Sequence, residues 1–106
     1  MALQRIEFGP RHTRAYVAAR NDGGKAAKFD FYRSKITQGS ERAGQTDPFD
    51  YNLPKPKPNL QPGEQTEGVV IFKQTDPSQP LQVSFAWERG GFIADRPQPL
   101  VFEVAP

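Results

Sequence analysis

The chain has 106 residues, no cysteine, one histidine and a formal net charge of +2, which suits one small domain. The lack of cysteine excludes disulfide frameworks, thiolate zinc sites, iron–sulfur clusters and cysteine nucleophiles. Val, Ile, Leu and Phe supply 23 residues, enough for a core. The longest unbroken apolar run, Val69 to Phe72, is too short to span a membrane. We therefore expect a single domain over 1–106 and no membrane insertion.

Few residues are suited to catalysis or metal binding. His12 is the single histidine and lies in Arg11-His12-Thr13-Arg14, where the arginines disfavour an imidazolium and do not orient a general base. Asp47 and Asp50 offer two calcium ligands, but no third acid is nearby and such aspartates commonly cap turns. We expect no enzyme, and so no catalytic residue, no cofactor and no metal.

The beginning of the chain alternates with the period of two that is typical of strands. Gln4 to Phe8 alternates over a short span, and Thr13 to Arg20 reads as a longer strand. The face expected to be buried in this longer strand carries Ala15, Val17 and Ala19. Asn21 to Gly24 then supplies residues that tolerate positive φ, which predicts a hairpin at this point.

Two further strands are predicted before and after the middle of the chain. One begins near Lys28, and its pattern changes phase near Tyr32-Arg33, which predicts a β-bulge or a crossing between sheets. The other runs from Gln65 to Lys73 and is apolar on both faces from Val69 to Phe72. A strand that is apolar on both faces is typical of the centre of a sheet, so we expect a central strand here.

The clearest alternation runs from Leu81 to Glu88. Its apolar face ends in Trp87, which we interpret as a core residue. Pro99 to Ala105 predicts the last strand, and Arg89 to Phe92 predicts a turn with Phe92 and Ile93 on its far side.

No segment has a convincing helical pattern, although Ser40 to Ala43 is compatible with a single helical turn. The count is about seven strands with turn residues between them. This pattern predicts an all-β fold, an immunoglobulin-like antiparallel β-sandwich.

The region 39–64 departs from the strand pattern and is expected to form one long Pro-rich loop. Lys55-Pro56-Lys57-Pro58 predicts polyproline II, with the lysines projecting and the backbone solvated. A long loop on a rigid scaffold often carries binding. We therefore select as candidate partner contacts Phe49, Tyr51, Lys55 and Lys57.

Several stretches resemble a bacterial family, the DUF4352-type immunoglobulin-like β-sandwich domain, which is related to the mycobacterial secreted antigen MPT63. The similar stretches are Leu60-Gln61-Pro62-Gly63-Glu64, Gly68-Val69-Val70-Ile71-Phe72, Asp76-Pro77, Pro80-Leu81-Gln82-Val83, Thr13-Arg14-Ala15-Tyr16-Val17 and Asn21-Asp22-Gly23-Gly24-Lys25. The resemblance implies a fold and a secreted or cell-surface module, often a lipoprotein, with no catalytic residues. The chain shows no signal peptide, so its compartment stays open.

Two glycines of this resemblance have a structural interpretation. Gly63 follows Pro62 in Gln61-Pro62-Gly63-Glu64, which predicts a type II turn with positive φ at the glycine. Gly68 is expected to let a neighbouring chain approach or to permit a bulge.

Charge is divided unevenly along the chain, with +5 over residues 1–42 and −3 over residues 43–106. A basic half can attract nucleic acid, but no nucleic-acid motif is present, so we disfavour that partner. The basic and aromatic residues that would form such a surface are Arg14, Tyr16, Arg20, Lys28, Tyr32, Arg33 and Lys35.

The favoured function is a non-catalytic interaction or structural module that recognises another protein through loops or sheet edges. Self-assembly into a larger particle or surface layer is the first alternative. Binding of a carbohydrate or cell-wall polymer on exposed aromatic residues is the second.

Overall fold

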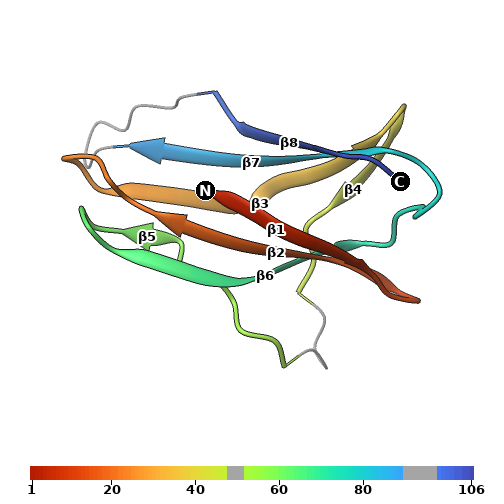
Figure 1. Ribbon diagram of the computed structural model, residues 1–106, viewed down its shortest axis with the longest axis horizontal. Coiled ribbons are helices and arrows are strands. Elements are labelled where there is room, and N and C mark those ends of the chain that lie inside the picture. The colour runs from red at the N-terminus through yellow and green to blue at the C-terminus, as the bar shows by residue number, and fades with distance from the viewer. Residues whose placement is uncertain (48–51, 90–97) are drawn as a thin grey trace.

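The computed structural model describes residues 1–47, 52–89 and 98–106 and is an antiparallel β-sandwich, with no helix in these ranges (Figure 1). Sheet A has three strands, in the order β1 (Ala2–Phe8), β2 (His12–Arg20) and β6 (Gln65–Lys73). Sheet B has the order β4 (Glu41–Gly44), β3 (Ala27–Gln38), β7 (Leu81–Arg89) and β8 (Leu100–Val104), and β5 (Asn59–Leu60) also pairs with β3. The expected all-β antiparallel sandwich is confirmed.

The core lies where the inner faces of the two sheets meet. Ala15 and Val17 of β2 and Phe85 of β7 are all 0% exposed, as the alternation predicts. The Phe85 ring makes edge contacts with Phe72 and Phe102, with ring centroids 6.2 and 6.1 Å apart. Burial of each large apolar side chain contributes about 1.5–3 kcal/mol, so this alternation is the main source of stability.

The connection from β2 to β3 is not the hairpin that the sequence predicts. β2 pairs with β1 and β6 in sheet A, whereas β3 belongs to sheet B, so residues 21–26 cross from one sheet to the other. Positive φ is found at Gly39 and Gly63 and not at Gly23 or Gly24. Turn-forming residues allow a hairpin but do not require the flanking strands to pair with each other.

The phase change in β3 is confirmed as an irregularity within one strand. The pairing register with β7 shifts between Asp30 and Lys35, and the Ser34 hydroxyl donates a hydrogen bond to the Asp30 carbonyl at 3.1 Å. Beyond this point β3 pairs with β4, where the sequence allowed a helical turn. Gly39, with φ of 59°, opens the two-residue turn between them, which a II′-type hairpin requires.

β6 is an edge strand of sheet A and not the central strand that its apolar sequence predicts. Val70 and Phe72 face the core between the sheets. Val69 and Ile71 are also buried, and they line a cavity of about 470 Å³ together with Leu53. β6 therefore needs apolar residues on both faces although no strand of sheet A lies beyond it.

The strand count also differs from the expected one. β4 and β5 lie inside the region 39–64, which was expected to be one long loop. Phe92 and Ile93, expected beyond a turn that follows Arg89, lie outside the described residues.

Candidate binding cleft

The residues selected from the sequence do not form one exposed contact surface. Phe49 and Tyr51 lie outside the described residues. Lys55 and Lys57 are exposed as predicted, but their ammonium groups lie 3.2 Å from Asp47 and 2.7 Å from Glu64, respectively. The two lysines therefore take part in contacts within the domain.

The Pro-rich segment 54–58 closes the side of the sandwich. The prediction that its backbone is solvated is wrong at several positions, where the backbone forms hydrogen bonds with the two sheets. Pro54 and Pro58 offer their carbonyls to the amides of Val69 in sheet A (2.8 Å) and Phe29 in sheet B (2.9 Å). The Lys57 amide donates to the Thr66 hydroxyl at 2.8 Å. The segment thus joins the edge of β6 to β3.

Gly68 makes this closure possible. A Cβ at Gly68 would clash with the Pro56 nitrogen and would lie only 2.7 Å from the carbonyl carbon of Lys55. The expectation that a neighbouring chain approaches this glycine is confirmed. Further along β6, the Thr46 amide donates to the Ile71 carbonyl at 2.8 Å, so this edge is covered at several points.

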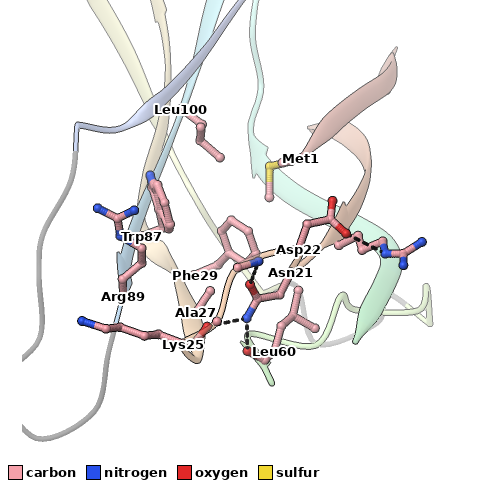
Figure 2. A pocket seen from close by; sticks show the side chains of 13 residues that line it. Met1, Asn21, Asp22, Lys25, Ala27, Phe29, Leu60, Trp87, Arg89 and Leu100 are labelled. Atoms are coloured by element: carbon pink, nitrogen blue, oxygen red, sulfur yellow. Dashed lines mark hydrogen bonds and ion pairs between the residues drawn. The ribbon is translucent and has the colours of Figure 1, made fainter. Parts of the chain in front are cut away.

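A cleft of about 770 Å³ opens at the end of the sandwich where β2 ends and β3 begins (Figure 2). Its apolar lining comes from Met1 and from strands of sheet B, and consists of Met1, Ala27, Phe29, Leu60, Trp87 and Leu100. Phe29 and Leu60 belong to a second core cluster with Ala19. The volume and the apolar lining are typical of small ligand sites.

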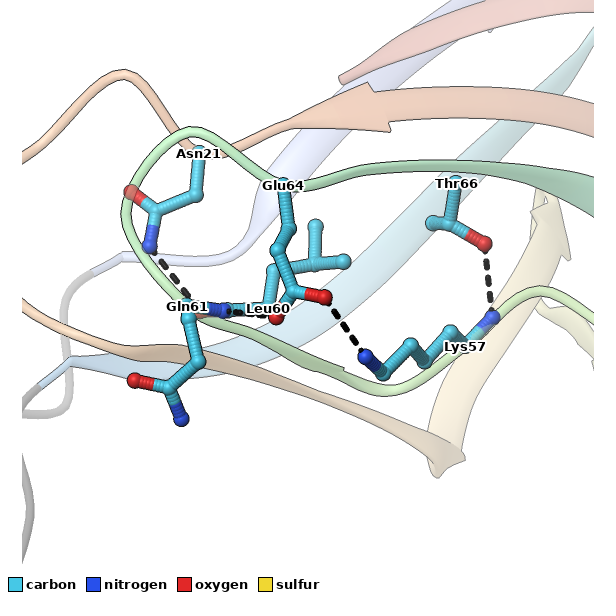
Figure 3. A network of polar contacts seen from close by, with 6 residues as sticks. All are labelled: Asn21, Lys57, Leu60, Gln61, Glu64 and Thr66. Carbon is cyan, nitrogen blue, oxygen red and sulfur yellow. Dashed lines mark hydrogen bonds and ion pairs between the residues drawn. The ribbon is translucent and has the colours of Figure 1, made fainter.

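Asn21 fixes the loop that borders this cleft. Its side-chain Nδ2 donates to the carbonyls of Lys25 (2.8 Å) and Leu60 (2.9 Å), and its Oδ1 accepts from the Gly23 amide (3.0 Å). Its main chain exchanges two further hydrogen bonds with the 60–64 turn, from Asn21 N to the Glu64 carbonyl and from Gly63 N to the Asn21 carbonyl. Asn21 is buried and joins the two loops at the end of the molecule (Figures 2 and 3).

The 60–64 turn is itself braced. Gly63 has φ of 85° and the Glu64 amide donates to the Gln61 carbonyl at 3.0 Å, which confirms the predicted type II turn. The Glu64 carboxylate accepts hydrogen bonds from Lys57 Nζ and from the Gln61 amide, both at 2.7 Å (Figure 3). These two bonds hold the pKa of Glu64 below its ordinary value, and the bond from Lys57 has the larger effect.

The border of the cleft is cationic on one side. Figure 2 shows Lys25, Arg89 and Trp87 on one side and Asp22, which forms an ion pair with Arg20, on the other. The ion pair measures 2.8 Å, and the Arg89 guanidinium lies 5.6 Å from the centroid of the Trp87 ring. The Trp87 indole N–H donates to the Gln98 carbonyl at 3.0 Å, so the ring is held in place while one part of it lines the cleft.

Sequence reasoning placed Trp87 in the core and did not identify the cleft. Trp87 does pack on the Phe29 and Leu60 cluster, but it also lines the cleft. The described lining residues come from five separate parts of the chain, so no local motif marks the cleft. The one available signal was the pair of turn sequences, Asn21 to Gly24 and Leu60 to Glu64, whose contact with each other is not encoded locally.

The basic residues weighed for nucleic-acid binding are divided between the two sheets. Arg14, Tyr16 and Arg20 lie on β2 in sheet A, whereas Lys28, Tyr32, Arg33 and Lys35 lie on β3 in sheet B. They do not form one aromatic and basic face.

Comparison with known proteins supports the fold. No family model and no curated protein sequence matches the chain. The solved structure of a candidate lipoprotein, YcdA of Bacillus subtilis, is similar, with a TM-score of 0.71 and 17% identity over 97% of this chain. The match covers 35% of that protein, so this chain corresponds to about a third of its length. Within the described ranges there is no helix that could cross a membrane.

Proposed function

We propose that this chain is a non-catalytic recognition module that binds a segment of another protein at the cleft between β2, β3 and β7. The observation that carries the proposal is an apolar cleft of about 770 Å³ at the loop end of a rigid sandwich. Loops on a rigid scaffold are common binding surfaces. A partner side chain seated on Phe29, Leu60 and Trp87 would be removed from water, which is favourable by about 1.5–3 kcal/mol.

The bordering loop supports this proposal because it needs little ordering on binding. Asn21 already holds residues 21–25 together through side-chain hydrogen bonds with Gly23 and Lys25. It ties them to the 60–64 turn through one side-chain hydrogen bond to Leu60 and two main-chain ones. A preformed site loses less conformational entropy when a partner binds, so more of the contact energy is left for affinity.

We also infer that the domain is immunoglobulin-like, of the DUF4352 type, and works outside the cell. The sequence motifs around Gly63 and Gly68 support this inference, and both glycines have the structural roles that the motif implies. The similarity of fold to YcdA, named a candidate lipoprotein, is in keeping with it.

The test is a selection of displayed peptides on the purified chain, followed by binding measurements on the selected sequences. Trp87 is the single tryptophan and lines the cleft, so its emission reports binding there directly. Gly24 lines the cleft, so the ring in Gly24→Phe obstructs its border. The chain should tolerate this change, because a Cβ at Gly24 meets nothing within 4 Å and the backbone there has no positive φ. We expect at least about tenfold weaker binding, which corresponds to losing the burial of one side chain.

The matched control is Gly44→Phe. Gly44 also has open space at its Cβ position, but it lies on β4 and does not line the cleft. This variant should bind the peptides as tightly as the parent chain. If Gly24→Phe also binds them unchanged, or if no selected peptide alters Trp87 emission, the cleft is not the recognition site.

A second candidate function, self-association, is favoured by the unequal protection of the sheet edges. The edge of β6 is covered by Thr46 and by residues 54–57, whereas no described segment pairs with the outer edge of β8. An uncovered edge can add a strand of a second copy. Light scattering over a concentration series tests this function.

A further inference from the structure

The loop at the cleft border contains a dipeptide, Asp22-Gly23, that is chemically prone to rearrangement. Gly23 is the one glycine of the chain that follows an aspartate or an asparagine. Because glycine has no side chain to obstruct the approach, its amide nitrogen can attack the γ-carboxyl carbon of the preceding aspartate. An N–Cγ bond forms, one water molecule leaves and a cyclic imide results. Water then opens the ring at the α-carbonyl, and the product is an isoaspartate whose main chain runs through the γ-carbon.

The structure leaves room for this reaction. The Asp22 side chain is 77% exposed, and Gly23 and Gly24 are exposed as well. Among the described residues, a Cβ built at Gly23 would have one neighbour within 4 Å, the Asn21 Oδ1 atom at 3.3 Å. Crowding therefore does not prevent the ring from forming, and water can reach it.

Two contacts instead hold the reacting groups in unreactive positions. The Gly23 amide, which is the nucleophile, donates its proton to Asn21 Oδ1 at 3.0 Å, and the Asp22 carboxylate lies 2.8 Å from the Arg20 Nε (Figure 2). Attack requires that the amide lose this proton and that the carboxyl group turn toward the Gly23 nitrogen. The ion pair also favours the ionised carboxylate, which is a much poorer electrophile than the protonated acid.

The first of these contacts is fixed by the rest of the molecule. Asn21 is buried, and its Nδ2 donates to the carbonyls of Lys25 at 2.8 Å and Leu60 at 2.9 Å. The Oδ1 atom that holds the Gly23 amide therefore cannot turn away unless the loop separates from the 60–64 turn.

We propose that Asp22-Gly23 is a site of spontaneous isoaspartate formation, and that Asn21 and Arg20 restrain this conversion for as long as the loop stays closed. The conversion adds one atom to the main chain and would displace the Gly23 amide from Asn21, so it would alter the border of the cleft. The inference rests on the chemistry of the loop and is independent of the recognition function.

The experiment compares the whole chain with the peptide acetyl-RNDGGK-amide, which has the sequence of residues 20–25 without the fold. Both are aged together in a slightly acidic buffer. Isoaspartate is counted by methylation with an isoaspartate methyltransferase, and peptide mapping assigns it to residue 22. We expect conversion in the folded chain to be at least about tenfold slower than in the peptide, because the loop must open before it reacts. Equal rates would refute the restraint, and a peptide that does not convert would refute the site.

Asn21→Ala tests the hydrogen bond to the Gly23 amide. We expect the chain to convert about tenfold faster relative to its own peptide, acetyl-RADGGK-amide, which corrects for the change in local sequence. Gly68→Ala is the matched control, because it should also destabilise the fold but lies on β6 and leaves the bond between Asn21 and Gly23 in place. If both variants accelerate conversion equally, the reaction follows unfolding of the whole domain and the role of Asn21 is refuted.

Arg20→Gln tests the ion pair at a position where folding is not at risk, since the Arg20 side chain is 63% exposed. We expect conversion to be about threefold faster, relative to acetyl-QNDGGK-amide, as suits an exposed pair. Arg42→Gln, at an exposed position on β4, makes the same change in net charge and should convert like the parent chain. Equal rates in these two variants would refute the role of Arg20.

Discussion

Asn21 determines the shape of the cleft border through contacts that no other side chain replaces. Asn21→Ala leaves the Leu60 carbonyl and the Gly23 amide without their side-chain partners. A buried polar group that loses its partner costs about 1–3 kcal/mol, so we expect the free energy of unfolding to fall by about 2–3 kcal/mol. Urea denaturation measures this. Asn59→Ala, at an exposed position on β5, should stay within about 0.5 kcal/mol of the parent chain.

Gly68 is required because Pro56 fills the space that a side chain would occupy. Gly68→Ala should lower the free energy of unfolding by about 1–3 kcal/mol, since the added methyl group must displace backbone atoms of Lys55 and Pro56. Gly44→Ala, at a strand position with open space, should have little effect or a small stabilising one. Equal effects of the two variants in denaturation would show that Pro56 does not pack against β6 in this way.

Glu64 makes stability depend on pH in a defined direction. Its pKa is lowered in the folded chain, first by the hydrogen bond from Lys57, so its contribution is complete above the ordinary value of 4.5 and is lost as pH falls through the lowered pKa. Glu64→Gln should therefore flatten the decline in stability below pH 4.5. Denaturation midpoints from pH 6 to pH 2 measure this decline.

Two further carboxylates limit how flat that profile becomes. The pKa values of Glu7 and Asp76 are lowered as well, chiefly by hydrogen bonds from Tyr16 and Ser78, so part of the slope should remain in Glu64→Gln. Glu103→Gln removes an exposed carboxylate of β8 and controls for the change in net charge. A slope reduced equally by both variants would contradict a specific role of Glu64.

The segment 54–58 can be tested as an element by amide hydrogen exchange. If it joins the two sheets, the amides of Val69 and Phe29, which donate to Pro54 and Pro58, should exchange at least about 100-fold more slowly than that of exposed Gly24. A solvated polyproline segment would leave the Val69 amide unbonded on the edge of β6. Fast exchange at Val69, together with slow exchange at neighbouring Val70, would show that the segment does not cover this edge.

Individual strands were predictable because burial of one face leaves a local pattern. Ala15 and Val17 in β2, and Val83 and Phe85 in β7, are buried as their alternation predicts. Which strands pair with each other leaves no such pattern in the local sequence. Nothing within Asn21 to Gly24 records that β2 and β3 belong to different sheets, and β4 and β5 are too short to show a period.

The candidate site was less predictable than the fold for the same reason. Lys55 and Lys57 were selected because lysines beside prolines are exposed, but exposure does not reveal the partners Asp47 and Glu64. The cleft depends on contacts such as that of Asn21 with Leu60, which join segments far apart in the sequence. The one local clue, Gly63 in its turn, predicted the backbone correctly but not what the turn borders.

Across the whole molecule, the two sides of the sandwich differ in how their sheet edges are protected. On the side of β6, the edge is occupied by Thr46 and the Pro-rich segment. On the other side, β1 carries the charged residues Arg5 and Glu7 and a register irregularity after Leu3, which disfavour strand addition. β8 has neither an irregularity in its pairing with β7 nor more than one charged residue, Glu103. It is therefore the edge best suited to a second copy.

Antiparallel pairing of two β8 strands centred on Phe102 would place Val101 opposite Glu103 of the second copy and keep the two carboxylates apart. Val101 is 50% exposed, so pairing would also cover apolar surface.

We expect the mass from light scattering to rise from monomer toward dimer with concentration. Val101→Lys should suppress the rise, because a lysine on an edge strand disfavours pairing. Tyr32→Lys, which replaces an exposed aromatic residue on β3, should leave the rise unchanged. Charge reversal at Lys55 and Lys57 would test this poorly, since it breaks their ion pairs within the domain. A constant monomer mass at all concentrations would refute association through β8 and leave the cleft as the surface that meets a partner.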